Sequence, residues 1–91
     1  MQVIRFTADW CGPCKKYAPV FKQFSEQTDN AEFFTVDADE QPDVFQRYKV
    51  TSVPTTLIYI GGREVYRVFG PQTTAQLEEL VGKAHAVVTR Q

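Results

Sequence analysis

The chain has 91 residues, 43% of them hydrophobic and 13% aromatic, which is enough apolar surface for one packed core and excludes a disordered chain. Ten basic and eleven acidic residues give a net charge of −1 without a long run of one sign, so the composition excludes the basic surface of a protein that binds nucleic acid or anionic lipid. No apolar stretch is long enough to span a membrane, and no signal-type apolar core precedes Arg5 and Asp9, so we expect a single cytoplasmic domain over residues 1–91.

The N-terminal third of the chain predicts a strand followed by a helix. Val3 to Thr7 is a short apolar, β-favouring run that leads into the sequence Ala8-Asp9-Trp10-Cys11-Gly12-Pro13-Cys14. From Cys11 onward, apolar side chains recur at three- and four-residue spacing, which predicts a helix that ends near residues 28–30. Pro19 lies inside this pattern and lacks a backbone N–H, so we expect it to bend the helix rather than end it.

The next segment predicts a second strand and a short helix. Phe33 to Val36 is an apolar, β-favouring run, and we expect it to lie parallel to the first strand because a right-handed helical crossover joins the two. Pro42 suits the first turn of a short helix, whose apolar positions are Val44, Phe45 and Tyr48.

A β-hairpin is predicted in the C-terminal half. Thr55 to Ile60 and Glu64 to Phe69 are typical of two antiparallel strands, and Gly61-Gly62 is typical of the two-residue turn that joins such strands. Within this hairpin we expect Tyr59 and Tyr66 to face each other across the strands.

The chain ends in a predicted helix. Thr73, followed three residues later by Gln76, matches a capping box, and a buried stripe follows it at Leu77, Leu80, Val81, Ala84 and Val88. The order of elements is therefore β-α-β-α-β-β-α. This order predicts an α/β fold with a central four-stranded mixed sheet and helices on both faces.

The two cysteines indicate a redox site. Cys11 and Cys14 lie three residues apart at a helix start, where a disulfide can join them with little backbone movement. The positive end of the helix dipole favours a thiolate at Cys11, which we interpret as the nucleophile, and Cys14 is placed to resolve a mixed disulfide. A zinc site would need further ligands, and the only histidine is His85, so we expect no metal. A purely structural disulfide is disfavoured because so short a loop constrains the unfolded chain little.

The residues around the two cysteines and around Pro54 resemble those of the thioredoxin family. The run Trp10-Cys11-Gly12-Pro13-Cys14-Lys15 reproduces the family's active-site signature, and Ser52-Val53-Pro54-Thr55 stands where the family has a cis-proline opposite its cysteines. The resemblance extends over essentially the whole chain: Pro19 matches the family's helix kink, Gly62 its hairpin turn and Gly70 a glycine of its substrate groove. It implies a thioredoxin-like fold and a substrate-binding surface made of Trp10, Gly12, Pro13, Val53, Pro54, Phe69 and Gly70.

The resemblance also implies a function. It indicates a monomeric general protein-disulfide reductase that needs no bound cofactor, acts on disulfide-containing protein substrates and is recharged by an NADPH-dependent flavoprotein thioredoxin reductase. Two alternatives remain open at this point. One is a dedicated, glutaredoxin-like electron donor to a single enzyme such as ribonucleotide reductase, and the other is a binding subunit in which turnover is irrelevant.

Two features depart from the family pattern. Thioredoxins usually carry a further strand and helix before the strand that leads to the cysteines, so here we expect four strands, with Phe33 to Val36 at an exposed edge if the chain is complete. Many thioredoxins also place a buried aspartate six residues before the nucleophile, whereas this chain has Arg5 there. Arg5 is either a partly exposed cation that favours thiolate at the site or an inert surface residue.

Overall fold

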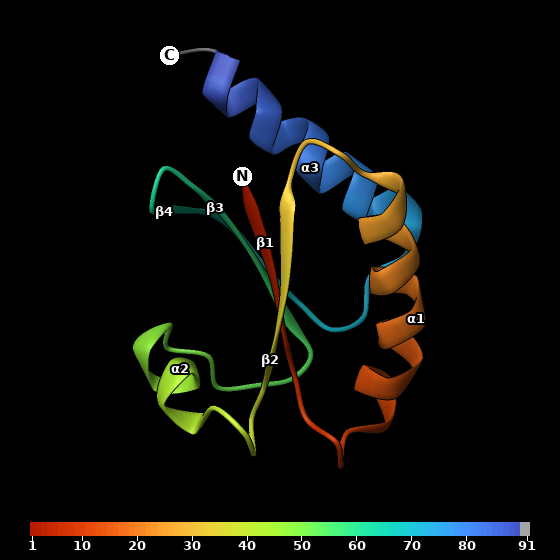
Figure 1. Cartoon of the computed structure of the whole chain (residues 1–91), viewed down its shortest axis with the longest axis vertical. Coiled ribbons are helices and arrows are strands. Elements are labelled where there is room, and N and C mark those ends of the chain that lie inside the picture. The colour runs from red at the N-terminus through yellow and green to blue at the C-terminus, as the bar shows by residue number, and fades with distance from the viewer. Residues whose placement is uncertain (90–91) are drawn as a thin grey trace.

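The computed structural model describes residues 1–89, and its elements follow the predicted order (Figure 1). Each predicted strand and helix is present, and the boundaries differ from the prediction by at most a few residues. The elements are β1 (Gln2–Thr7), α1 (Gly12–Gln27), β2 (Glu32–Asp37), α2 (Pro42–Arg47), β3 (Thr55–Ile60), β4 (Arg63–Phe69) and α3 (Thr74–Thr89).

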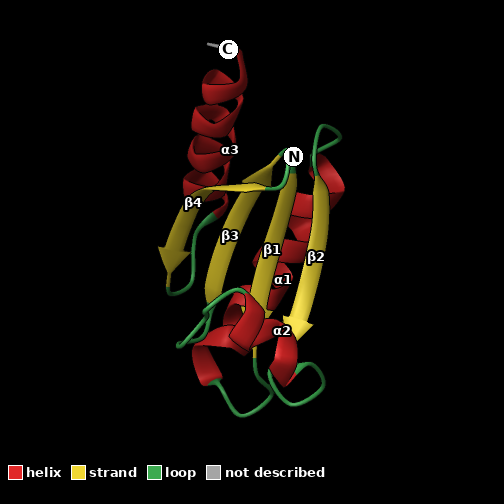
Figure 2. Cartoon of the chain, turned by 90° about the vertical axis from the view of Figure 1, so that its left-hand side faces the viewer, coloured by secondary structure: helices red, strands yellow, loops and turns green. Residues whose placement is uncertain are grey.

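The four strands form one mixed sheet in the order β2-β1-β3-β4 (Figure 2). Strand β1 pairs parallel with β2 and antiparallel with β3, and β3 pairs antiparallel with β4. The parallel pair, the antiparallel hairpin and the position of β2 at an edge of the sheet agree with the prediction, whereas the pairing of β1 with β3 was not predicted. The C-terminal end of β1 lies beside the start of β3, since Phe6 pairs with Thr55, so the loops that follow β1 and precede β3 meet at one end of the sheet.

Helices cover both faces of the sheet, as predicted. Alternate side chains of β1 point to opposite faces. Val3 joins the core under α1 and α3, whereas Ile4 and Phe6 join the core under α2. The first core contains Val3, Tyr17, Phe21, Phe24, Ile58, Leu77, Val81 and Ala84. The second contains Ile4, Phe6, Val36, Val50 and Leu57.

Two predictions about the helix ends are confirmed: Pro19 does not end its helix, and Thr73 and Gln76 form a capping box. Helix α1 continues through Pro19 to Gln27. At the start of α3, the Thr73 backbone N–H donates to Gln76 Oε1 at 2.8 Å and the Gln76 N–H donates to Thr73 Oγ1 at 3.1 Å, which completes the capping box. The side chain of Val88, an expected member of the buried stripe, lies outside the described residues.

The expected contact between Tyr59 and Tyr66 is wrong. The pairing of β3 with β4 shifts register between Ile58 and Tyr59, so Tyr66 lies opposite Ile58 and Tyr59 lies opposite Glu64. Tyr59 packs on Tyr48 beside α2, with ring centroids 5.4 Å apart, and Tyr66 packs against the core on the other face. The extra residue of the bulge therefore places the two rings on opposite faces of the sheet.

Candidate redox site

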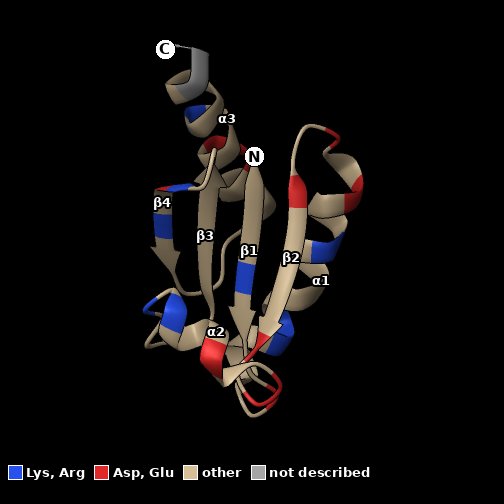
Figure 3. Cartoon of the chain, turned by 60° about the vertical axis from the view of Figure 1, so that its left-hand side comes forward, with Lys and Arg blue, Asp and Glu red and all other residues tan. Residues whose placement is uncertain are grey.

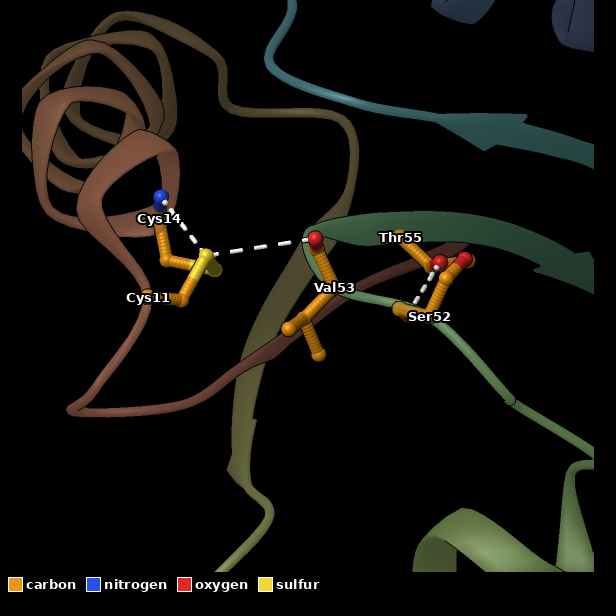
Figure 4. The surroundings of a disulfide bond; sticks show 5 residues. All are labelled: Cys11, Cys14, Ser52, Val53 and Thr55. Carbon is orange, nitrogen blue, oxygen red and sulfur yellow. Dashed lines mark hydrogen bonds between the residues drawn. A yellow bond between two sulfur atoms is a disulfide. The ribbon is translucent and has the colours of Figure 1, made fainter.

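Cys11 and Cys14 form a disulfide at the start of α1, with their Cα atoms 5.2 Å apart (Figure 4). Cys11 is the N-cap residue of the helix and has an extended backbone, with φ −96° and ψ 113°. Its Sγ accepts a hydrogen bond from the Cys14 backbone N–H at 3.2 Å. This N–H is one of the donors that an α-helix leaves unpaired at its first turn, so Cys11 sulfur occupies the position that a serine or aspartate oxygen takes at other helices.

The two sulfurs differ in exposure. Cys11 is 7% exposed and Cys14 is 1% exposed, and both pack with Ala8, Ala38 and Val53 in a small apolar cluster. Cys14 is therefore shielded from a large reactant, whereas Cys11 lies at the surface side of the pair. In a pair with unequal exposure, the more exposed sulfur can react with a protein substrate, and the buried sulfur can react afterwards within the protein.

The loop before β3 faces the disulfide. The Val53-Pro54 peptide bond is cis, as the family resemblance implied, and Val53 O lies 3.9 Å from Cys11 Sγ (Figure 4). In the disulfide state Sγ carries no proton, so this distance is a contact; a reduced Cys11 thiol can donate to the same carbonyl. Thr55 Oγ1 donates to Ser52 O at 2.8 Å, which closes the turn around the proline.

Gly70 completes this end of the sheet. Its backbone N–H donates to Pro54 O at 2.8 Å, and its φ of +83° is a conformation that glycine adopts without steric cost. Phe69, the last residue of β4, is 63% exposed beside it. Trp10, on the loop directly before Cys11, is 71% exposed, so Trp10 and Phe69 are two large aromatic side chains that lie in solvent.

All of the predicted site residues lie at this end of the sheet or in the segments that enter it. Gly12 and Pro13 are exposed in the first turn of α1, and Val53 packs against the cysteines. The structure adds a shallow apolar depression of about 190 Å³, which the sequence pattern did not predict because its walls come from four separate segments. It is lined by Trp10, Ala38, Phe45, Val50, Thr51, Ser52 and Val53.

Arg5 lies in the middle of β1, at the single basic position of that strand (Figure 3). It is half-buried: its guanidinium lies 5.5 Å from the centroid of the Phe21 ring, and Nη2 donates to Thr35 Oγ1 at 3.4 Å. Burial lowers the pKa of Arg5, and the nearby Tyr17 acts in the opposite direction. A guanidinium nevertheless stays protonated in proteins, so a fixed positive charge lies inside this face of the fold.

Comparison with known proteins identifies the family. The model of the thioredoxin family matches residues 1–83. The chain belongs to the thioredoxin family. Thioredoxin-2 of Saccharomyces cerevisiae is 48% identical over 73 residues, which cover 80% of this chain and 70% of the yeast protein. The crystal structure of thioredoxin NaTrxh from Nicotiana alata matches 90% of this chain and 70% of its own, with a TM-score of 0.84 and 39% identity. The solution structure of oxidised thioredoxin from Plasmodium falciparum matches 91% and 79%, with a TM-score of 0.80 and 34% identity.

Family membership and the cysteine pair define the activity. The protein is a thiol–disulfide oxidoreductase that reduces protein disulfides, and the dedicated donor and the binding subunit are not favoured by these relatives. Its substrates are proteins with disulfides, and a reductase must restore its dithiol after each turnover. Within residues 1–89, no helix has the length and apolar character needed to cross a membrane. The same residues contain no group of three or more His, Cys, Asp or Glu side chains that could hold a metal ion.

Proposed function

We propose that Cys11 is the nucleophile and Cys14 the resolving thiol of a general protein-disulfide reductase. The observation that carries this assignment is the position of Cys11 Sγ as the acceptor of the Cys14 backbone N–H at the helix start. In the reduced protein the same N–H and the positive end of the helix dipole stabilise a thiolate at this sulfur. The exposure of Cys11 relative to Cys14 supports the same order of roles.

The reaction consists of two thiol–disulfide exchanges. The Cys11 thiolate attacks one sulfur of a substrate disulfide, so a Cys11–substrate bond forms and the other substrate sulfur leaves as a thiolate. The Cys14 thiolate then attacks Cys11 Sγ, which breaks the bond to the substrate and forms the Cys11–Cys14 disulfide. Two electrons pass from the protein dithiol to the substrate, and the product substrate is a dithiol after it takes up protons from solvent.

The substrate would lie along the loop before β3. Trp10, Gly12 and Pro13 flank Cys11 on one side, and the Val53-Pro54 loop lies on the other. Gly70 and Phe69 extend this surface, because the Gly70 N–H is bonded to Pro54 O. The Pro54 nitrogen carries no proton, but Val53 retains backbone groups that an extended substrate strand can bond. We therefore assign substrate binding to Trp10, Gly12, Pro13, Val53, Pro54, Phe69 and Gly70.

For the cellular cycle, we assign an NADPH-dependent flavoprotein thioredoxin reductase as the electron donor. The protein would act as a monomer in the cytoplasm. Two of these three assignments have simple readouts: consumption of NADPH with the purified reductase tests the electron donor, and the mass in solution at micromolar concentration tests the monomeric state.

Trapping of the mixed disulfide tests the order of the two cysteines. Cys14→Ser, reduced and mixed with insulin, should accumulate a covalent adduct at Cys11 that mass spectrometry locates and that dithiothreitol releases. Cys11→Ser is the matched control. It should form an adduct much more slowly than Cys14→Ser, because its remaining thiol, Cys14, is buried. An adduct that forms equally well through Cys14 in this control would overturn the assignment. Failure of the wild-type pair to cycle in a glutathione buffer would overturn the proposed function itself.

A further inference from the structure

A cavity of about 310 Å³ lies behind the disulfide, between β1, the start of α1 and the end of β2. Cys14 and Arg5 both line it. The other charged side chains in its wall are Lys15 on α1, Asp9 on the loop after β1, Asp37 at the end of β2 and Glu40 on the loop that follows. The wall of the cavity thus contains Cys14, a half-buried cation and a rim of surface charges.

Arg5 is the half-buried cation of this wall, and its guanidinium has few polar partners. Its Nε is buried and has no hydrogen-bond partner among the described residues, and its Nη2 has only the long contact with Thr35 Oγ1. From α1, the Phe21 ring lies 5.5 Å from its guanidinium, and the titratable group that acts on it is Tyr17. Burial raises the pKa of Tyr17, so this side chain is neutral at pH 7. No carboxylate forms an ion pair with Arg5 in the described part of the chain, so its charge acts on the cavity without local neutralisation.

The carboxylates of the rim are placed differently. Asp37 Oδ1 accepts the backbone N–H groups of Asp39 at 2.8 Å and Glu40 at 3.3 Å, so it is occupied by its own loop. Asp9, Glu40 and Lys15 are exposed, and water and salt screen exposed charges strongly. Among the charged residues that line the cavity with Cys14, Arg5 is therefore the half-buried cation, and solvent screens it less than it screens the exposed charges.

We propose that Arg5 is a positioning residue that stabilises the thiolate of Cys14 across this cavity. The proposal rests on the proposed function, in which Cys14 resolves the mixed disulfide. In that step the Cys14 S–H proton passes to solvent through the cavity, the Cys14 thiolate attacks Cys11 Sγ, and the substrate sulfur leaves with the electron pair of the broken bond. A fixed cation lowers the free energy of the Cys14 thiolate. Attack of Cys14 on the mixed disulfide therefore needs no carboxylate to accept its proton.

The test measures the ionisation of Cys14 without turnover. In a Cys11→Ser background Cys14 is the only thiol, and its thiolate absorbs near 240 nm; a Cys11→Ser, Cys14→Ser protein supplies the tyrosine baseline. Adding Arg5→Met should move the midpoint of this titration up by about 0.5 to 1 pH unit, which lowers the thiolate fraction near pH 7 by about threefold to tenfold. Arg5→Lys keeps the charge and should restore most of the shift. Asp9→Asn is the control for a rim carboxylate and should leave the midpoint within about 0.2 units.

The kinetic readout uses the otherwise wild-type pair. Arg5→Met should move the pH profile of mixed-disulfide resolution upward by the same amount, while the pH profile of Cys11 alkylation moves less. An unchanged Cys14 midpoint in Arg5→Met, with a native far-UV circular dichroism spectrum, overturns the proposal. A midpoint that moves in Asp9→Asn and not in Arg5→Met also overturns it and assigns proton transfer to the carboxylate. If Arg5→Met unfolds, Arg5→Lys against Arg5→Gln gives the same comparison. Because the Cys14 titration needs no substrate, its result stays separate from the insulin assay that tests the proposed function.

Discussion

The buried hydrogen bond between Tyr17 and Thr56 allows a quantitative test of how α1 is attached to the sheet. Tyr17 Oη and Thr56 Oγ1 lie 2.8 Å apart, either hydroxyl can donate, and both residues are about 1% exposed. Tyr17→Phe leaves the Thr56 hydroxyl buried without this partner, and Thr56→Val does the same to the Tyr17 hydroxyl. Each change should lower the free energy of unfolding by about 1 to 3 kcal/mol, which is the cost of an unsatisfied buried polar group.

The double variant separates this hydrogen bond from general effects of packing. Tyr17→Phe, Thr56→Val removes both hydroxyls, so we expect it to cost about 1 to 3 kcal/mol less than the sum of the two single changes. Urea unfolding of the oxidised protein, followed by far-UV circular dichroism, measures the four free energies. Fluorescence is a poor probe here, because Trp10 is mostly exposed in the folded state. Costs that add within about 0.5 kcal/mol would refute the argument.

Three further predictions follow from the site and the fold. Burial raises the pKa of Tyr17 above its ordinary value of 10.0, so above about pH 10 the unfolded chain loses this proton first, and the free energy of unfolding falls as the pH rises through the folded-state pKa. Tyr17→Phe should therefore flatten the alkaline side of a plot of unfolding free energy against pH. An unaltered slope would contradict this origin. Trp10→Ala combined with Phe69→Ala should lower kcat/KM for insulin by about 5- to 30-fold, while the free energy of unfolding changes by about 0.5 kcal/mol or less. The control Phe34→Ala, at an exposed aromatic of β2, should leave kcat/KM unchanged. Equal losses of kcat/KM in the double variant and in the control would argue against the assigned substrate surface. Arg67 donates to Tyr48 O at 2.7 Å and to Lys49 O at 3.1 Å, and it pairs with Glu64. Arg67→Ala should therefore lower the free energy of unfolding by about 1 kcal/mol, a value reduced for solvent exposure, and should speed amide hydrogen exchange in α2 more than in α3. An equal increase of the exchange rates in both helices would refute this link.

Local patterns in the sequence were sufficient to predict the order of elements. The apolar spacing after Cys11, the Gly61-Gly62 turn and the Thr73 capping box each specify a conformation through interactions over a few residues. The helix-start position of Cys11 follows from the same kind of signal, and the hydrogen bond from the Cys14 N–H to its sulfur agrees with it. The cis peptide before Pro54 was implied by the family resemblance alone, because proline by itself favours the trans form.

Features that depend on distant segments were not predictable in this way. The register shift between Ile58 and Tyr59 changes which face of the sheet each tyrosine occupies, and no local residue pattern predicts it. Arg67 was not singled out, although its guanidinium joins β4 to the end of α2 across 18 or 19 residues of sequence. The cavity between Arg5 and Cys14 likewise exists only once β1, α1 and β2 are placed together.

The polarity of the sheet separates the sulfur chemistry from the ends of the described chain. Gln2 pairs with Tyr59 at the end of the sheet where the Gly61-Gly62 turn lies, whereas Phe6 pairs with Thr55 next to the redox loop. Figure 1 shows the N-terminus and the far end of α3 on the side opposite the first turn of α1. A linker, tag or solid support attached at Met1 should thus leave the disulfide accessible to other proteins. The molecule is therefore suited to immobilisation through this end, with the disulfide directed away from the support.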